Sequence, residues 1–389
     1  MKQVNLLREK LRPHLGWHGA RLSFLAIFII ALIRVKTVNL SELATAFSGS
    51  ALTDSHYKRL QRFFKNFEID YETIAHTVVN LINIPQPWVL SIDRTEWKFG
   101  DKTFNILTLG IVYEGIAFPV VWSFLDKRGN SNTHERMELF QEFLKYFPDK
   151  YFKFLSAEHE FRKEKWGGLI QDAVLPNNQL MGFKTSPFFK EQSDREFVGQ
   201  DWFCYLLADP KTPFRIRIKE NYKLYDGKRN LSVKTVFQDL QPGESKVLRN
   251  KRRLWGLWLY VVAQRLDDGS LLVVVTQTEQ HRAIADYAYR WGIETLFGIF
   301  KTRGFCLEST HIKDSKRLSK LFAILTLALC WAVLIGEWLH QKKPLTIKKH
   351  GRKAKSIFRY GFDHLRSILL NLDVKMTAFT HTLQFLSCT

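Results

Sequence analysis

The chain is 389 residues long and carries a formal net charge of +20 at pH 7, with a pI near 9.7. This length exceeds a single core of about 250–300 residues, so two or three domains are expected. So large a positive charge predicts a polyanionic partner, nucleic acid first and an anionic membrane surface second. Hydrophobic residues make up 46% of the chain, with 31 Phe and 11 Trp, which excludes a disordered basic tail protein.

The cysteines indicate neither disulfide bonds nor a zinc site. The four cysteines form no CxxC pair and no His/Cys cluster at zinc spacing, so neither a disulfide framework nor a zinc site is expected. A reducing cytoplasm fits this usage. The first apolar run lies too far into the chain, and is too broken by charge, for a secretory signal.

Residues 1–85 are expected to form a helical N-terminal domain. Within them, residues 39–67 predict a helix, a turn at Gly49 and a second helix, with Asn39 or Ser41 as N-cap. This pattern is compatible with a helix-turn-helix that binds double-stranded DNA, although many helical hairpins share it. The basic residues of the second helix are Lys58, Arg59, Arg62 and Lys65.

The chain from residue 86 to 202 changes to a β-rich pattern. Three runs between Pro87 and Gly129 predict antiparallel strands separated by tight turns. Asn132 then caps a helical pattern, and residues 150–157 predict a fourth strand. The order β-β-β-α-β is that of the start of a ribonuclease-H-like core, a mixed α/β fold whose strand ends collect carboxylates. Fold order alone is only an analogy for function.

The rest of the chain divides into three predicted regions. Residues 203–278 are expected to form a β-rich insertion domain, and residues 279–311 return to helix within the core. Residues 312–389 predict a basic helical C-terminal region that contacts nucleic acid. The apolar run 321–335 is shorter than the ~20 residues needed to span a bilayer, so we expect a buried helix and no membrane.

The segment "YAYRWGIETLFGIFK" (287–301) carries polar residues at uneven steps. On one α-helix, Tyr287, Arg290, Glu294 and Lys301 would fall within a sector of about 60°. The core face would consist of Ile293, Leu296, Phe297 and Phe300. A simple alternative is a solvated face with an Arg290–Glu294 pair, worth only ~0.3–0.5 kcal/mol.

Three acidic residues are candidate ligands of a hard cation. Asp93 lies inside an apolar strand, where an acid is costly unless it is paired or binds metal. Asp194 begins "DREFVGQDW", and Glu294 projects from the predicted helix. Mg²⁺ prefers oxygen ligands and often takes only two or three carboxylates. If these acids converge, they could hold two ions ~3.5–4 Å apart for phosphoryl transfer on a phosphodiester.

The pattern Y-x-x-R-x-x-x-E-x-x-x-x-x-x-K resembles the signature of the IS4 family of DDE transposases, and "SIDRTEW" and "DREFVGQDW" resemble the regions around that family's first two catalytic aspartates. The resemblance implies a ribonuclease-H-like core interrupted by a β-stranded insertion, and cut-and-paste DNA transposition by a homodimer. It assigns Asp93, Asp194 and Glu294 as catalytic ligands of two Mg²⁺ (or Mn²⁺) ions. It assigns Tyr287, Arg290 and Lys301 to DNA contact.

Two tryptophans in the predicted insertion are further candidates for DNA contact. In relatives, a tryptophan of the insertion stacks near a flipped base, and Trp255 and Trp258 in "RRLWGLWLY" lie beside basic residues as such stacking requires. The alternative is that both are strand core.

The chain departs from the family pattern immediately before Asp194. Deleting residues 158–193 would restore "FLSADREFVGQDW" without a seam, so we interpret them as an in-frame insertion of 36 residues. Glu158 competes for the position of the second acid, because "EHEFRKEKW" echoes "DREFVGQDW". Displacing a metal ligand by even ~1 Å can cost about 10²-fold in rate. The alternatives to an active transposase are therefore an impaired relic that only binds DNA ends, or a stand-alone nuclease.

Overall fold

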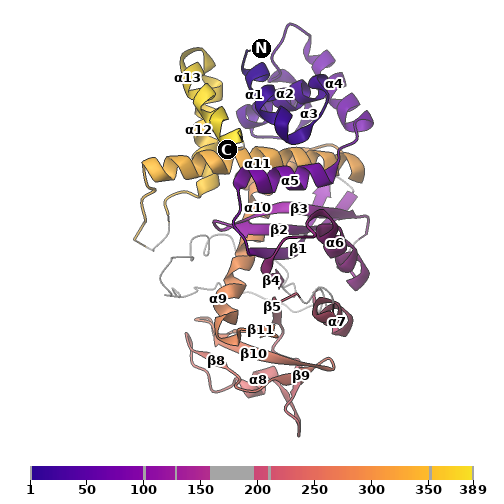
Figure 1. The fold of residues 1–389 in the computed structure, drawn as a ribbon, viewed down its shortest axis with the longest axis vertical. Helices are drawn as coiled ribbons and strands as arrows, with labels where there is room; N and C mark the ends of the chain where they lie inside the picture. Colours follow the sequence, from indigo (N-terminus) through magenta and orange to yellow (C-terminus); the bar gives the residue numbers. More distant parts are fainter. Residues whose placement is uncertain are drawn as a thin grey trace.

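A single eleven-stranded mixed sheet runs through the protein in this computed structural model, which describes residues 2–99, 102–127, 129–157, 197–208, 212–349 and 353–387 (Figure 1). The strand order is β3-β2-β1-β4-β5-β11-β10-β9-β6-β7, with β8 beside β10. The strands are β1 (Trp88–Phe99), β2 (Lys102–Tyr113), β3 (Ile116–Leu125), β4 (Phe152–Ala157), β5 (Phe214–Ile218), β6 (Lys223–Tyr225), β7 (Asn230–Ser232), β8 (Ser245–Val247), β9 (Arg252–Leu254), β10 (Leu257–Arg265) and β11 (Leu271–Thr276).

The first four strands follow the predicted order of a ribonuclease-H-like core, and β5 extends the sheet beyond them. β1, β2 and β3 pair antiparallel, while β4 pairs parallel to β1 and β5 pairs parallel to β4. Glu114 and Gly115 close the β2–β3 turn with φ of 48° and 75°, the left-handed conformation that a two-residue hairpin needs. Helix α6 (Thr133–Tyr146) starts with a capping box between Asn132 and Glu135 and leads to β4. The predicted mixed α/β fold class is confirmed.

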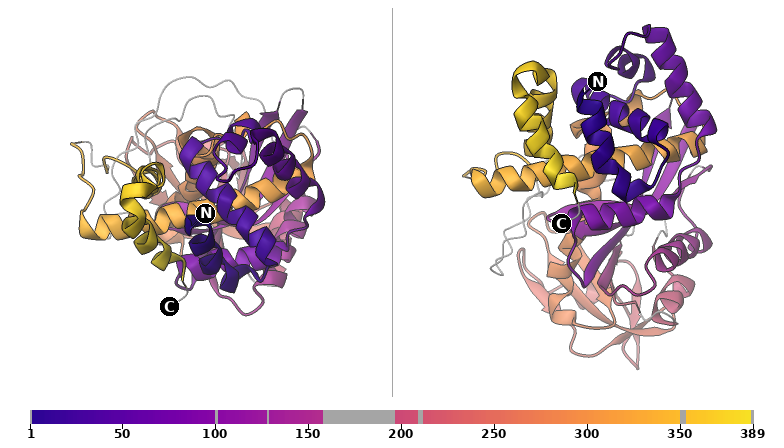
Figure 2. Two further views of the ribbon diagram at one scale, coloured as in Figure 1. Left: turned by 90° about the horizontal axis from the view of Figure 1, so that it is seen from above. Right: turned by 45° about the horizontal axis from the view of Figure 1, so that its top comes forward.

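Helices form the N-terminal part of the described chain. They are α1 (Lys2–Leu15), α2 (Gly19–Val35), α3 (Leu40–Thr45), α4 (Thr53–Asn66) and α5 (Tyr71–Ile82). The side chain of Asn39 caps α3 by accepting from the amides of Ser41 and Glu42, so Asn39 is the N-cap and Ser41 is not. In Figures 1 and 2, α1–α4 lie on one side of α11, and the sheet lies on the other.

The long helix α11 (Ser315–Lys342) joins the N-terminal helices to the sheet, and α12 (Ile357–Leu370) and α13 (Leu372–Thr382) follow it. The predicted buried helix at 321–335 is confirmed, but the helix has 28 residues, so the length argument against a membrane span was wrong. Its most apolar window is 89% buried within the protein, which is typical of a core helix. By length and composition alone, α11 could cross a membrane, and α1 and α2 would be a second such segment if they were counted as one bent span.

Candidate active site

Asp93 lies in the middle of β1, between β2 and β4, and only 6% of the residue is exposed. Its Oδ1 accepts a hydrogen bond of 2.7 Å from the backbone amide of Arg94. A buried carboxylate is stable only with charged or hydrogen-bonding partners. As the sequence predicts for an acid inside an apolar strand, Asp93 has polar partners.

Glu294 reaches the same point from α10 (Trp291–Gly298). Arg290 Nη1 lies 3.2 Å from Asp93 Oδ2 and 3.1 Å from Glu294 Oε1, so one guanidinium nitrogen bridges the two carboxylates. Arg290 and Asp93 are 197 residues apart in sequence. The predicted convergence of Asp93 and Glu294 is thus present. The formal charges of these three side chains sum to −1.

A close approach of α10 to the sheet fixes this geometry. A Cβ added to Gly292 would lie 2.8 Å from Val112 Cγ1 and 3.1 Å from the backbone nitrogen of Ala117. Only glycine therefore lets the helix backbone rest directly on β2 and β3. Since Gly292 stands two residues from both Arg290 and Glu294, this contact sets how far their side chains must reach.

The segment 287–301 is not the single α-helix that its spacing predicts. Helix α9 (Ala283–Tyr287) is followed by a 3₁₀ turn (Ala288–Arg290), then α10, then a π-helical turn (Ile299–Arg303). The changing pitch undoes the predicted common sector, since 3₁₀ and π turns advance by different angles from an α-helix. The predicted core face is confirmed, because all four of its residues are buried: Ile293, Leu296, Phe297 and Phe300.

Tyr287 and Lys301 lie in different surroundings from the two carboxylates. Tyr287 is 4% exposed and belongs to an apolar cluster with residues of α9, β10 and β11. Lys301 Nζ donates to the backbone carbonyl of Glu96 at 3.2 Å and lies 4.8 Å from the ring centroid of Trp97. Arg290 is 4% exposed. Direct DNA contact by these three residues stays a prediction.

The donor set at this site fits a hard cation in part. Asp93 and Glu294 supply carboxylate oxygens from a strand and a helix, the ligand type that Mg²⁺ and Mn²⁺ prefer. Within the described ranges there is no group of three His, Cys, Asp or Glu side chains that could hold a metal ion. The remaining candidates, Asp194 and Glu158, and the whole predicted insertion 158–193 lie outside the described residues.

One comparison with known proteins bears on this site. Residues 193–331 match the family model of the transposase DDE domain. This match covers over a third of the chain and includes both Asp194 and Glu294. The chain therefore resembles DDE transposases over this range, whereas the finer IS4 assignment stays a prediction.

Two other comparisons add little. No curated protein matches the chain. A cryo-EM structure of a piggyBac transposase synaptic complex with hairpin DNA is similar at a TM-score of 0.45 and 11% identity, covering 100% of this chain and 83% of that one. Superposition at that level is too loose to align individual residues.

The two tryptophans proposed to contact DNA differ in exposure. Trp258 is 49% exposed and lies across from Arg253 in the β9–β10 ladder, so the alternative that it is strand core is wrong. Trp255 occupies the β9–β10 turn with a φ of 48° and packs against Phe203 and Tyr222. An exposed indole next to an arginine fits the predicted stacking role better than a packed one.

The α4 helix carries its basic residues mostly on the surface. Lys58, Arg62 and Lys65 are exposed at steps of four and three, which places them on one face of the helix. Arg59 is half-buried, and its guanidinium lies 5.5 Å from the ring centroid of Phe24. Burial, and to a lesser extent Arg62, lower the pKa of Arg59. The face available to a polyanion is therefore Lys58, Arg62 and Lys65.

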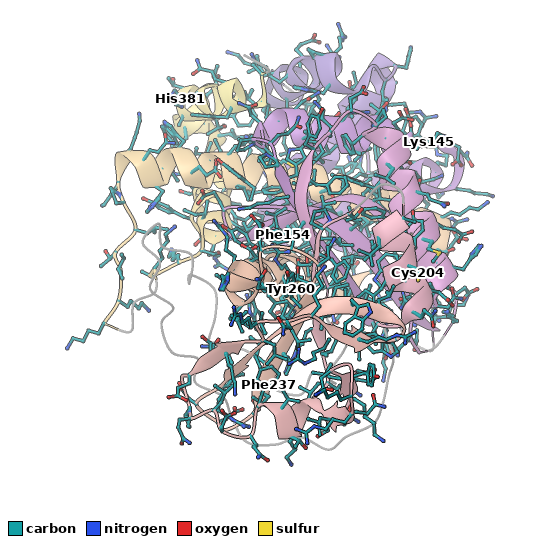
Figure 3. All side chains as sticks on the ribbon, turned by 60° about the horizontal axis from the view of Figure 1, so that its bottom comes forward. Lys145, Phe154, Cys204, Phe237, Tyr260 and His381 are labelled. Atoms are coloured by element: carbon teal, nitrogen blue, oxygen red, sulfur yellow. The ribbon has the colours of Figure 1, made fainter. Side chains whose placement is uncertain are left out.

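A buried ion pair between β5 and α9 was not predicted from the sequence. Arg215 on β5 is 0% exposed; its Nη2 lies 2.9 Å from Asp286 Oδ2 and 3.0 Å from Glu279 Oε2. Its guanidinium also lies 5.1 Å from the ring of Phe154, which Figure 3 labels on the neighbouring strand β4. The available signal was a charged residue within the apolar run "FRIRI" and an acid in "IADYAYR".

Proposed function

We propose that the protein is a DDE transposase that cleaves double-stranded DNA at the ends of an insertion sequence and joins the freed ends to target DNA. The observation that carries this proposal is the convergence of Asp93 and Glu294 on Arg290. The family match from residue 193 onward supports it, because the match begins next to Asp194, where the predicted insertion ends.

The residues would divide the chemistry as follows. Asp93, Glu294 and Asp194 would hold two Mg²⁺ (or Mn²⁺) ions, which supply an activated water and stabilise the leaving oxygen of an in-line displacement. Arg290 keeps the two described carboxylates together before a cation is present. Its positive charge also offsets part of their repulsion. Lys301, whose Nζ lies 4.8 Å from the ring centroid of Trp97, would bind a phosphate near the cut.

The finer parts of the proposal follow from the sequence resemblance. They are membership of the IS4 family, a homodimer on paired transposon ends, and action in the bacterial cytoplasm at the nucleoid. A second candidate function is DNA-end binding without cleavage. The insertion at 158–193 favours it, because it abuts a predicted metal ligand and a small displacement there would reduce the rate strongly. A third candidate, a stand-alone nuclease, would cut without joining ends.

Substitution of either carboxylate should abolish cleavage without abolishing DNA binding. With Asp93→Asn or Glu294→Gln, Mg²⁺-dependent cleavage of a duplex carrying the element's own ends should fall by at least about 10²–10³-fold, because each removes a carboxylate that would hold a metal ion in place at the reacting phosphate. Asp149→Asn, at an exposed acid after α6, is the matched control and should cleave normally.

The same assay separates the candidate functions. Cleavage by the intact protein that Asp93→Asn removes supports the enzyme, and joined products distinguish a transposase from a nuclease. Cleavage only after deletion of residues 158–193 would identify a binding relic. If Asp93→Asn and Asp149→Asn cleave equally, Asp93 is not part of the active site.

A further inference from the structure

Two exposed basic segments meet beside the candidate active site. One is the end of β1 and the start of β2, with Lys98 and Lys102, and the other is the segment from Lys301 to the start of α11. Lys301 Nζ contacts the carbonyl of Glu96 at 3.2 Å, and Lys102 Nζ contacts the carbonyl of Lys313 at 3.4 Å. These two contacts, each between a lysine and a backbone oxygen, hold the segments together.

The side chains along this line are mostly basic and exposed. We use the name basic track for Lys98, Lys102, Lys301, Arg303, Lys313 and Lys316. All but Lys301, which is half-buried, are exposed. Residues 301–317 alone contain five Lys or Arg and two acids, a formal net charge of +3.

The acidic residues on these segments do not neutralise the positive charge of the track. Asp314 caps α11 by accepting from the amide of Arg317, and its carboxylate lies 3.9 Å from Arg317 Nε. Glu96 and Glu308 are the other acids of the described parts of these segments, and both are exposed. The cationic charge of the track therefore remains in excess and faces solvent.

The far end of the track reaches the N-terminal helices. Thr37 Oγ1 lies 2.6 Å from Ser309 Oγ, and Asn39 Nδ2 lies 3.3 Å from His311 Nε2. Asn39 is the N-cap of α3, which packs against α4 and its exposed basic face. These contacts, together with the short stretches of chain between them, link β1 beside the Asp93–Glu294 site to the track and the track to the helix pair.

We propose that the basic track is a phosphate-binding surface along which one DNA duplex lies, so that the α3–α4 helix pair and the Asp93–Glu294 site engage the same molecule. This inference rests on the proposed function and adds the path of its substrate. Lysines spaced along a surface bind phosphates as point charges without reading bases. The track therefore supplies affinity and position, and sequence choice is left to other contacts.

The test compares salt dependence between two matched double variants. The track variant is Lys313→Gln/Lys316→Gln, and the control is Lys145→Gln/Lys150→Gln, two exposed lysines at the end of α6, where Figure 3 labels Lys145. Each removes two charges from the full-length protein. Binding is measured, in Mg²⁺-free buffer, to a labelled duplex of roughly three helical turns, about 30 bp.

The slope of log K against log salt is negative, and each lost phosphate contact makes it shallower by about 0.9. The slope of the track variant should therefore be shallower by about 1.8, and that of the control should not change. Lys313→Arg/Lys316→Arg should keep the slope, because phosphate binding here needs charge rather than lysine. Suppose that the intact protein binds and cleaves DNA but the track variant and the control variant show the same slope. The proposed path of the DNA along the track is then wrong, and the proposed function stands. If the intact protein binds no DNA, both fail. Reduced binding to anionic phospholipid vesicles, with DNA binding unchanged, would assign the track to a membrane surface and overturn the proposal.

Discussion

Replacing Asp286 with alanine is expected to destabilise the protein by about 3–5 kcal/mol, because it leaves a buried guanidinium without its main partner. Arg215 is 0% exposed, and its Nε and Nη2 lie 3.0 and 2.9 Å from Asp286 Oδ2. Its remaining partners are the Thr276 hydroxyl at 2.8 Å, the backbone carbonyl of Phe214 at 3.1 Å and the half-exposed carboxylate of Glu279. Of these partners only Glu279 carries a charge, and its exposure to solvent weakens the pair.

The measurement is the free energy of unfolding from denaturant titration. Asp239→Ala is the matched control, since Asp239 forms an exposed pair with Lys246 in the same β-rich region and should contribute little. The double variant Arg215→Met/Asp286→Leu should recover much of the loss, because apolar residues can replace a buried ion pair. A loss for Asp286→Ala no larger than that for Asp239→Ala would show that the pair does not stabilise the fold.

This pair matters to the active site through the path of the chain. Asp286 is on α9, and the 3₁₀ turn that follows α9 ends at Arg290. Arg215 is on β5, the strand that connects the ribonuclease-H-like strands to β11. The ion pair therefore anchors, on the sheet, the segment from which Arg290 and Glu294 project.

Replacing Gly361 with alanine is expected to cost about 3–5 kcal/mol, or to prevent folding, because α11 and α12 cross with their backbones in contact. An added Cβ would lie 1.9 Å from the carbonyl oxygen of Ala332 and 2.4 Å from the nitrogen of Gly336. Both neighbours are backbone atoms of the buried helix α11, so neither can move aside as a flexible side chain would.

Gly19→Ala is the control, since Gly19 is also helical and an added Cβ there meets nothing within 4 Å. Thermal unfolding of the two variants checks the prediction, and Gly361→Ser, which adds a similar Cβ, should behave like Gly361→Ala. Equal melting temperatures for Gly361→Ala and the wild type would mean that the helices do not cross as closely as described.

The parts of the fold that local sequence determines could be predicted. The order of the first four strands and α6 followed from alternating apolar residues, turn dipeptides and the Asn132 cap, which are properties of neighbouring residues. The pairing of β5 with both β4 and β11 did not follow. These pairings join residues far apart in sequence, so no local turn motif predicts them.

The candidate site was predicted in composition but not in geometry. The spacing of residues 287–301 indicated Glu294 and the apolar strand indicated Asp93, and the structure brings the two side chains to one guanidinium. The assumption of one α-helical pitch placed Tyr287 beside them, whereas the 3₁₀ turn ahead of α10 leaves it in an apolar cluster. The bridging position of Arg290 depends on β1, 197 residues away, and no local pattern predicts such a contact.

The central claim, that Asp93 and Glu294 share one metal site, is tested most directly by loading the protein with Fe²⁺ in place of Mg²⁺ and adding hydrogen peroxide with ascorbate. Hydroxyl radicals formed from the peroxide at the bound iron then cut the nearby polypeptide, and ascorbate returns the iron to Fe²⁺. We predict cuts near residue 93 and near residue 294, both lost in Asp93→Asn, and a third cut near 194 or 158 that identifies the second acid. Cuts at neither position, or a cut near 294 that survives Asp93→Asn, would contradict the claim.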